Sequence, residues 1–355
     1  MHPRQMRRIL LAVLVLLVLG AGWLLYRLND RPNLETYASL WLASQEGAAA
    51  GPRVTITFLG VATLLISDGE TSFMTDGFFT RPPKASVFLG RIAPDPDLIA
   101  RSLERAGIHE LAAVIAVHSH YDHAMDSPEV ARRTGALLIG SESTANIGRG
   151  VGFPEEHIRV VEPGAPMRLG AFTVTAIPSQ HFPHGMAMGE IRAPLVPPAR
   201  AMDYLEGGSF SVLVAHQAGS LLVQGSAGWQ DGALAGRHAD VVLLGIGGLG
   251  RRDEAYREDY WRAVVGSVAP RCVIPIHWDD FTLPLSAPLE PPPRLLDDVA
   301  ASLDFLMSKT AGASEARSEA KPSEVHPGAP GLGLLPAWKP VTLLGVGAAR
   351  CGTAG

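Results

Sequence analysis

The sequence is poor in cysteine and in charged side chains, and both shortages restrict what the protein can be. Only Cys272 and Cys351 stand among 355 residues, too few for a disulfide framework or a thiolate zinc site. The apolar run around Cys272 predicts a small buried residue, and Cys351 lies in the C-terminal tail. Charged residues make up 18% of the chain, and the formal net charge is −5. The sequence has no basic run and no basic patch with interleaved aromatics, so we expect no nucleic-acid partner.

Two other patterns are missing. The sequence has no Gly-x-Ser-x-Gly element, so a serine nucleophile on a strand-to-helix elbow is not expected. It also has no tandem repeat at solenoid spacing. Apolar residues make up 47% of the chain, which is enough for a sizeable core in one large domain or two small ones.

The N-terminus predicts a membrane anchor. Arg4, Arg7 and Arg8 precede the charge-free run Ile9–Tyr26, which is just long enough to cross a bilayer. The arginines should stay in the cytoplasm, so we expect a single-pass inner-membrane protein with its main domain on the periplasmic side. The alternative is a secreted protein released by signal cleavage. We favour the uncleaved anchor, because apolar residues continue past the small residues where cleavage would occur.

Composition and periodicity divide the chain into five segments. They are an anchor over residues 1–28, a spacer over 29–52, a catalytic domain over 53–310, a flexible Ala/Ser/Glu/Pro/Gly-rich insertion over 311–331, and a terminal strand and tail over 332–355. Within the domain, hairpin-like strands come first and then mix with helices, twice over. This order predicts an α+β fold in which two sheets pack face to face with helices outside.

The stretch "AVIAVHSHYDHAMD" places four potential metal ligands within six positions, directly after an apolar strand. Alternate residues of a strand point to the same side, so His118 and His120 should lie together. Asp122 and His123 follow where the chain bends towards a helix. Imidazole and carboxylate are ligands suited to zinc, so we predict a metal site at this end of the strand.

Further ligands must come from elsewhere, and two other histidines also follow apolar strands. The run "FTVTAIPSQH" ends on His181, and "RCVIPIH" ends on His277. His184 competes with His181. We prefer His181, because it lies nearer its strand and the loop with Pro183 and Gly185 is less able to hold a ligand.

The motif "HSHYDH" resembles the His-x-His-x-Asp-His signature of the metallo-β-lactamase superfamily. The likeness runs from about Val54 to Phe281 and includes "FLGVATLLISDGETSFMTDGFF" and "VIPIHWDDF". It is most similar to the lactonase-like and N-acylphosphatidylethanolamine phospholipase D-like members. The resemblance implies an αββα sandwich, with two mixed sheets between outer helices and one or two metals at the sheet edges.

The resemblance also implies roles for single residues. One metal would be held by His118, His120 and His181, and the other by Asp122, His123 and His277. Asp76 in "FMTDG" matches the family's early aspartate, which would orient a ligand by hydrogen bonding to it. An ordinary Asp-Gly turn is the alternative interpretation of that residue.

One position departs from the family pattern. Most hydrolytic members carry an aspartate that bridges both metals, and Ser226 in "GSAGW" stands at the expected place. A serine hydroxyl is uncharged and a poor zinc ligand, so the second metal should bind more weakly. A branch of the zinc β-lactamases resembles this arrangement and still binds two zincs, so the sequence allows one Zn²⁺ or two. Iron and manganese suit the same ligands.

The function implied is metal-assisted hydrolysis of an ester, lactone, amide or phosphodiester. A zinc-bound or bridging hydroxide would attack the substrate while Asp122 holds it, which makes Asp122 the expected catalytic residue. The anchor and the Met-rich stretch "HFPHGMAMG" favour a small-molecule substrate of lipid or envelope origin. Two alternatives stay open: a membrane-tethered, non-catalytic binding or assembly module with the same fold, and an iron-dependent redox enzyme. The sequence says nothing about oligomeric state.

Overall fold

Two seven-stranded sheets form the body of the protein in the computed structural model, which describes residues 3–44, 51–319 and 330–352. The first sheet has the order β14-β1-β2-β3-β4-β5-β6. Its strands are β1 Arg53–Phe58, β2 Leu64–Ser67, β3 Ser72–Thr75, β4 Ala113–Ile115, β5 Leu137–Gly140, β6 Ile158–Val160 and β14 Pro340–Gly345. The second has the order β13-β12-β11-β10-β9-β8-β7. Its strands are β7 Pro166–Leu169, β8 Phe172–Ser179, β9 Ser209–His216, β10 Gly219–Gln224, β11 Val241–Gly245, β12 Cys272–Ile276 and β13 Gly331–Leu332.

Both sheets contain parallel and antiparallel neighbours, and the direction of each strand decides at which edge of the sheet it ends. Strands β3 to β6 run parallel to one another, and so do β10 to β13. Strand β8 pairs antiparallel with β9, and β9 pairs antiparallel with β10. Strands β8, β10 and β12 therefore share one direction, so the loops that follow them leave the second sheet at the same edge.

The main core lies between the sheets. Phe73 of β3 and Phe172 of β8 meet edge to face with their ring centroids 5.2 Å apart. Buried aliphatic side chains of both sheets, such as Ile56, Val174 and Leu222, belong to the same cluster. Fully burying a large aliphatic side chain contributes about 1.5–3 kcal/mol, so these faces hold the sheets together. The predicted face-to-face packing of two sheets is confirmed.

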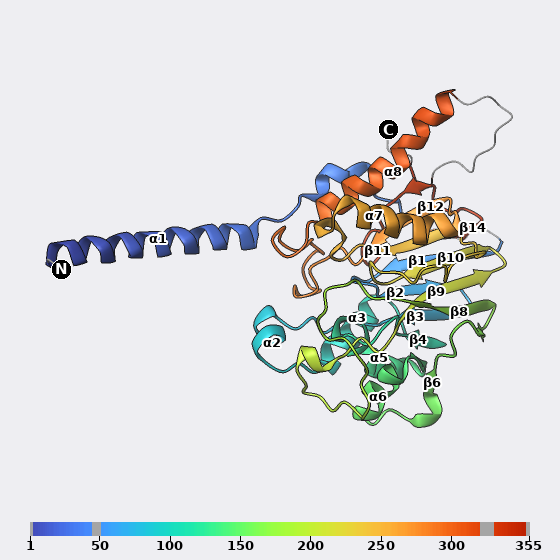
Figure 1. Cartoon of the computed structure of the whole chain (residues 1–355). Coiled ribbons are helices and arrows are strands. Elements are labelled where there is room, and N and C mark those ends of the chain that lie inside the picture. The colour runs from blue at the N-terminus through green and yellow to red at the C-terminus, as the bar shows by residue number, and fades with distance from the viewer. Residues whose placement is uncertain (1–2, 45–50, 320–329, 353–355) are drawn as a thin grey trace.

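Seven helices besides α1 lie in the described part of the chain. They are α2 Lys84–Leu89, α3 Pro96–Arg105, α4 Tyr121–Ala124, α5 Ser127–Thr134, α6 Glu142–Gly150, α7 Glu254–Trp261 and α8 Val299–Glu319. Short helical turns are η1 Leu34–Leu40, η2 Glu155–His157, η3 Ala201–Asp203, η4 Leu249–Arg251 and η5 Arg262–Gly266. Helices α3, α5 and α6 gather at one end of the molecule and α7 and α8 at the other (Figure 1). Helix α3 begins where Asp95 accepts hydrogen bonds from the backbone N–H groups of Asp97 and Leu98, the usual way to satisfy a helix start.

Helix α1, Pro3–Asn29, projects from the domain as a single rod (Figure 1). It is long and apolar enough to cross a membrane, and none of its most apolar window is buried inside the protein. A signal sequence passes the same test. The predicted transmembrane role of α1 therefore stays a prediction.

Several predicted elements differ in extent. The strand expected over 113–117 ends at Ile115, because the N–H of Val117 is bonded to the Asp76 carboxylate and not to a neighbouring strand. The stretch "RLLDDVAASLDFLMSK" predicts a helix from Arg294, but helix α8 begins at Val299. The flexible insertion expected over 311–331 is helical as far as Glu319, and β13 begins at Gly331. Residues 320–329 lie outside the described part of the chain.

The cysteines also differ from expectation, because Cys272 and Cys351 form a disulfide with their Cα atoms 5.6 Å apart. The spacing of two cysteines far apart in sequence could not reveal this pair. Strand β13 pairs with the start of β12, and Leu332 of β13 forms a bridge with Gly352 of the tail. These two pairings carry Cys351 to Cys272.

Candidate metal centre

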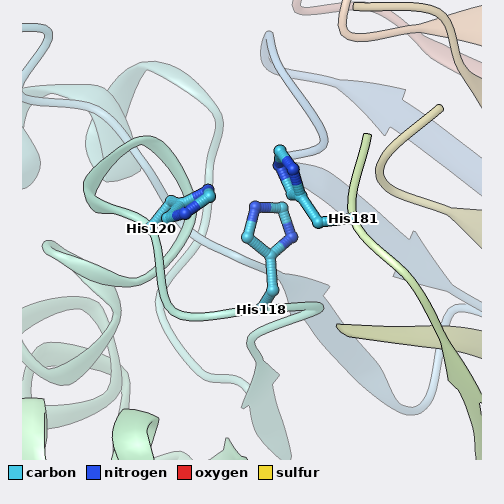
Figure 2. Close-up of side chains that lie close together, drawn as sticks. All are labelled: His118, His120 and His181. Atoms are coloured by element: carbon cyan, nitrogen blue, oxygen red, sulfur yellow. The ribbon is translucent and has the colours of Figure 1, made fainter. Parts of the chain in front are cut away.

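Three histidines from two sheets face one another at one side of the candidate site (Figure 2). His118 and His120 lie in the loop after β4, and His181 follows β8. One ring nitrogen from each lies within 4.8 Å of those from the other two. The ring centroid of His181 is 4.6 Å from that of His118 and 4.5 Å from that of His120. The structure thus brings together the first group of side chains that the sequence singled out.

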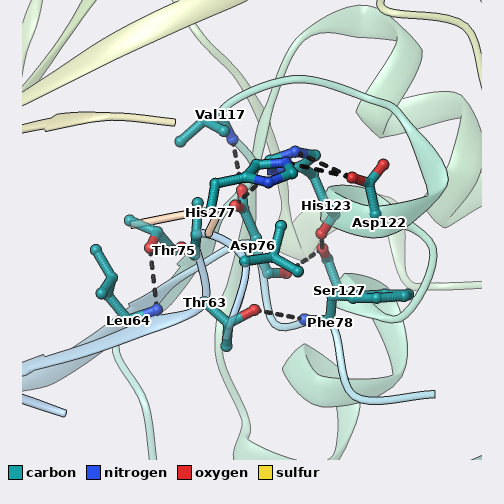
Figure 3. A network of polar contacts seen from close by, with 12 residues as sticks. Thr63, Leu64, Thr75, Asp76, Phe78, Val117, Asp122, His123, Ser127 and His277 are labelled. Atoms are coloured by element: carbon teal, nitrogen blue, oxygen red, sulfur yellow. Dashed lines mark hydrogen bonds and ion pairs between the residues drawn. The ribbon is translucent and has the colours of Figure 1, made fainter. Parts of the chain in front are cut away.

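The second group consists of Asp122, His123 and His277 (Figure 3). Asp122 and His123 come from the short helix α4, and His277 directly follows β12. Oδ2 of Asp122 lies 3.6 Å from Nε2 of His123 and 3.5 Å from Nε2 of His277. The ring centroids of His118 and His123 are 3.8 Å apart, so the two groups form one continuous centre.

Asp76 holds His123 of the second group in place, as Figure 3 shows. One of its carboxylate oxygens lies 2.8 Å from Nδ1 of His123, and the other accepts the N–H of Val117 at 2.9 Å. Ser127 donates from its hydroxyl to the backbone oxygens of Asp76 and His123. The position of Asp76 therefore fixes the ring of His123 and leaves its Nε2 aimed at the centre.

His277 sits on a strained backbone. Its φ is +58°, and that of Val61, whose backbone oxygen accepts the N–H of His277 at 2.7 Å, is +54°. Such angles are unfavourable for a β-branched valine and need support from their surroundings. Asp279 supplies that support, since its carboxylate accepts the N–H of Val61 at 2.7 Å and pairs with buried Arg81 at 2.5 Å.

Burial and neighbouring charges set the protonation of the centre. Burial lowers the pKa of His118 well below its usual value, and the adjacent histidines lower it further. Burial also lowers the pKa of His120 to about 4 and that of His181 to about 2. For Asp122, burial acts to raise the pKa, but His123 and His277 outweigh it and hold the pKa well below its usual range. His118, His120 and His181 are thus neutral and Asp122 is ionised, the protonation states in which these groups bind metals. Burial acts to lower the pKa of His123, but the carboxylates of Asp76 and Asp122 outweigh it and raise that pKa.

The centre fits a metal ion on two structural observations. Both ring nitrogens of His118 and Nε2 of His123 are buried and lack a hydrogen-bond partner among the described residues. Such unpaired polar atoms are costly unless something else binds them. The second observation is the spacing of Asp122 from its neighbours. Its Oδ2 lies 3.5 Å from Nε2 of His277 and 3.6 Å from Nε2 of His123, which is too long for good hydrogen bonds. Two ligand atoms that share one zinc at about 2.1 Å in tetrahedral geometry lie about 3.4 Å apart, close to these distances.

His184 and Ser226 lie next to the centre without joining either ligand group. The ring of His184 is 4.6 Å from that of His181, and its Nδ1 accepts the N–H of Met186 at 2.9 Å. Ser226 is nearly buried, and its hydroxyl oxygen accepts the N–H of Phe182 at 2.9 Å. Ser226 thus holds the backbone immediately after His181.

Sequence reasoning missed three supports of the centre. Gln224 donates to the backbone oxygens of Ser226 and Gly228, behind the loop that carries His181. The Arg81–Asp279 pair supports His277, and Nε2 of His120 lies 3.2 Å from the backbone oxygen of Ala187. Only Asp279 had a visible signal, because it stands two residues after His277 in the motif "HWDDF". The other supports depend on contacts between distant segments.

The chain is similar to one family model and to several known proteins. The family model described as "Beta-lactamase superfamily domain" matches residues 55–277. A UPF0173 metal-dependent hydrolase of Methanopyrus kandleri is 26% identical over 232 residues, covering 64% of this chain and 84% of that protein. A UPF0173 metal-dependent hydrolase of Carboxydothermus hydrogenoformans is 28% identical over 231 residues, with coverages of 64% and 85%. The solved structure of Igni18, a metallo hydrolase from Ignicoccus hospitalis, is 16% identical, covers 78% of this chain and 96% of its own, and has a TM-score of 0.42.

Proposed function

This chain belongs to the β-lactamase superfamily, and we propose that it is a metal-dependent hydrolase whose centre holds two zinc ions. The observation that carries the proposal is the convergence of six ligand-type side chains with buried, unpaired imidazole nitrogens. The relatives named above as metal-dependent hydrolases support the same reaction class.

We assign the two groups of the centre to the two ions. His118, His120 and His181 would hold one ion, and Asp122, His123 and His277 the other. Five imidazoles and one carboxylate are a donor set that suits zinc, and iron or manganese can occupy the same set. The second ion is expected to bind more weakly, because the hydroxyl of Ser226 carries no charge and already accepts the N–H of Phe182.

When bound, the metals would supply Lewis acidity that lowers the pKa of water and polarises the substrate. The chain's own residues do the rest. Asp122 stays ionised, so its carboxylate can accept a hydrogen bond from the attacking water and orient it, which makes it the proposed catalytic residue. Asp76 fixes the ring of His123, and the Tyr121 and Phe281 rings, 6.1 Å apart at their centroids, form an apolar wall beside His277.

We further propose an ester, lactone, amide or phosphodiester substrate with an apolar part. Support comes from the loop after His181, in which Met186, Met188 and Met202 expose about half of their side-chain surface. An apolar group could lie against these methionines while its polar linkage reaches the centre. Exposed apolar side chains gathered at one place commonly mark an interaction site.

The proposed location is the extracytoplasmic face of a membrane, with α1 as anchor. Arg4, Arg7 and Arg8 at the start of α1 favour a cytoplasmic N-terminus and place the domain on the other side. The Cys272–Cys351 disulfide supports this side, because disulfides persist in oxidising compartments and are rare in the cytosol.

The experiment is metal analysis of the purified protein together with a panel of lactam, lactone, thioester, ester and phosphodiester substrates. We expect two zinc ions per chain and hydrolysis of one substrate class. His118→Ala should lower kcat/KM by more than about 100-fold, since even the outer partners of metal ligands cost 10–100-fold. The control is His157→Ala, which removes a largely exposed imidazole in η2.

Other outcomes would redirect the assignment. A stable protein that binds no metal and hydrolyses nothing would instead fit a tethered, non-catalytic module. Bound iron with oxygen-dependent turnover would fit a redox enzyme. Wild-type turnover in His118→Ala would contradict the proposed centre directly.

A further inference from the structure

The end of α1 is clamped to the domain. The backbone oxygen of Asp30, the first residue after α1, accepts the N–H of Arg294 at 2.8 Å. Arg31 donates to a carboxylate oxygen of Asp280 at 2.9 Å and to the backbone oxygen of Pro291 at 2.5 Å. Because no free linker separates α1 from these contacts, a membrane crossed by α1 must lie directly against this face of the domain.

Helix α2 lies beside the clamp. Lys84, its first residue, lies 3.1 Å from the same oxygen of Asp280 that Arg31 binds. One carboxylate therefore ties the base of α1 and the start of α2 together. Accordingly, α2 protrudes on the same side of the domain as α1 (Figure 1).

The tip of α2 is unusually apolar for an exposed element. Phe88 is 72% exposed and Leu89 is 90% exposed, and no residue of α2 is fully buried. Val87, by contrast, packs against the domain in the same cluster as Tyr121 and Phe281. The helix is thus fixed to the domain on one side while its two largest apolar side chains point outward.

A second exposed apolar segment adjoins α2. We name residues 182–206, which carry Met186, Met188, Val196 and Met202, the rim loop. Ile92 and Ala199 pair through backbone hydrogen bonds of 2.7 and 3.0 Å, which join the segment after α2 to the rim loop. Outside α1, the large exposed hydrophobic side chains of the described residues lie on α2 and the rim loop, except for Val160, Leu296 and Val346. The rim loop also reaches the metal centre through His184 and Ala187.

We propose that Phe88 and Leu89 insert into the surface of the lipid bilayer that α1 crosses. The inference rests on the anchor role proposed above for α1. Short apolar segments held at such an interface add to membrane binding by burying their apolar surface among the headgroups. The contact fixes the orientation of the domain, so the rim loop and the entrance to the metal centre face the lipid. The substrate is then an amphiphile whose apolar part stays in the bilayer during hydrolysis.

The test uses the full-length chain in phosphatidylcholine vesicles. Both native cysteines are in the disulfide, so Leu89→Cys can be labelled selectively with an environment-sensitive fluorophore under non-reducing conditions. The matched control is Val160→Cys on β6, an exposed apolar position away from α1 and α2 (Figure 1). We expect brominated lipids to quench the label at Leu89 several-fold more strongly than the label at Val160. Equal quenching at the two positions overturns the proposal.

A second variant tests the orientation. Phe88→Ser with Leu89→Ser alters only exposed side chains, so the fold should persist. In this double variant, quenching of a label at Met188→Cys should fall by about twofold or more, because one of two membrane contacts is lost. Unchanged quenching would contradict the proposal that α2 fixes the orientation of the domain on the bilayer.

The readouts separate this inference from the proposed hydrolase. Flotation of the protein with vesicles reports on α1, and the labels report on α2, with no metal or substrate needed. A chain that does not float overturns the anchor and the bilayer contact together. A chain that floats with an unquenched Leu89 label overturns the bilayer contact alone and leaves the hydrolase proposal standing.

Discussion

Single residues around the centre act mainly by holding others in place. Ser226 shows this most clearly, because it stands where the family pattern has a metal-bridging aspartate. Its hydroxyl accepts the N–H of Phe182, the residue after His181, at 2.9 Å. Asp76 does the same for His123 through its carboxylate. The positions of the His181 and His123 imidazoles therefore depend on the hydrogen bonds made by Ser226 and Asp76.

Ser226→Ala should weaken metal binding at the group that contains His181. The change removes one acceptor, which costs about 1 kcal/mol of unfolding free energy and frees the backbone beside His181. We expect a lower zinc affinity by competition with a chromophoric chelator and a small loss of stability in urea. Ser308→Ala, which removes a hydroxyl bonded within α8, serves as the control. Unchanged zinc affinity in Ser226→Ala would show that this hydrogen bond does not position His181.

Among the elements, β12 connects the disulfide to the candidate metal centre. Its first residue, Cys272, is bonded to Cys351 of the tail, and His277 directly follows its last residue. The disulfide closes a segment with a sequence separation of 79 residues that contains α8, β13 and β14. Through this closure, the C-terminal tail supports the strand that leads to His277 in the second group of the candidate centre.

Cys351→Ser should lower the free energy of unfolding by about 2–4 kcal/mol, because an open segment of this length gains conformational freedom on unfolding. Chemical denaturation of both proteins, with and without reductant, measures the difference. Reductant should destabilise the wild type and leave Cys351→Ser unchanged. Two free thiols in the oxidised, denatured wild type would contradict the disulfide.

At the scale of the whole molecule, the metal centre joins the two sheets. His118, His120, Asp122 and His123 follow β4 of the first sheet, whereas His181 and His277 follow strands of the second. An ion shared between these groups would link the sheet edges that the apolar core already holds together. Metal binding should therefore stabilise the whole domain.

Removing the metal with a chelator should lower the melting temperature, and adding zinc should restore it. At a free zinc concentration 100 times the Kd, one site contributes about 2.7 kcal/mol, so the shift should grow with zinc concentration. Differential scanning calorimetry over a zinc series measures it. His118→Ala should show a smaller shift than the wild type. A melting temperature independent of zinc and chelator would speak against a metal shared by both sheets.

The sequence by itself determined what depends on local pattern. Strand and helix periodicity predicted two packed sheets with outer helices, and the motif "HSHYDH" predicted the cluster of His118, His120, Asp122 and His123. His181 and His277 were predicted as further ligands because each directly follows an apolar strand, and the structure places both beside the same cluster. The apolar run of α1 is a property of composition alone.

Only the tertiary structure decided what depends on distant segments meeting. The Cys272–Cys351 disulfide, the Arg81–Asp279 support of His277 and the Asp280 link between Arg31 and Lys84 each join residues far apart in sequence. Side-chain spacing along the chain carries no signal for such pairs, because sheet order and loop path set their separation. The physical reason is that periodicity fixes which face of an element is buried, whereas contacts between elements fix which functional groups it meets.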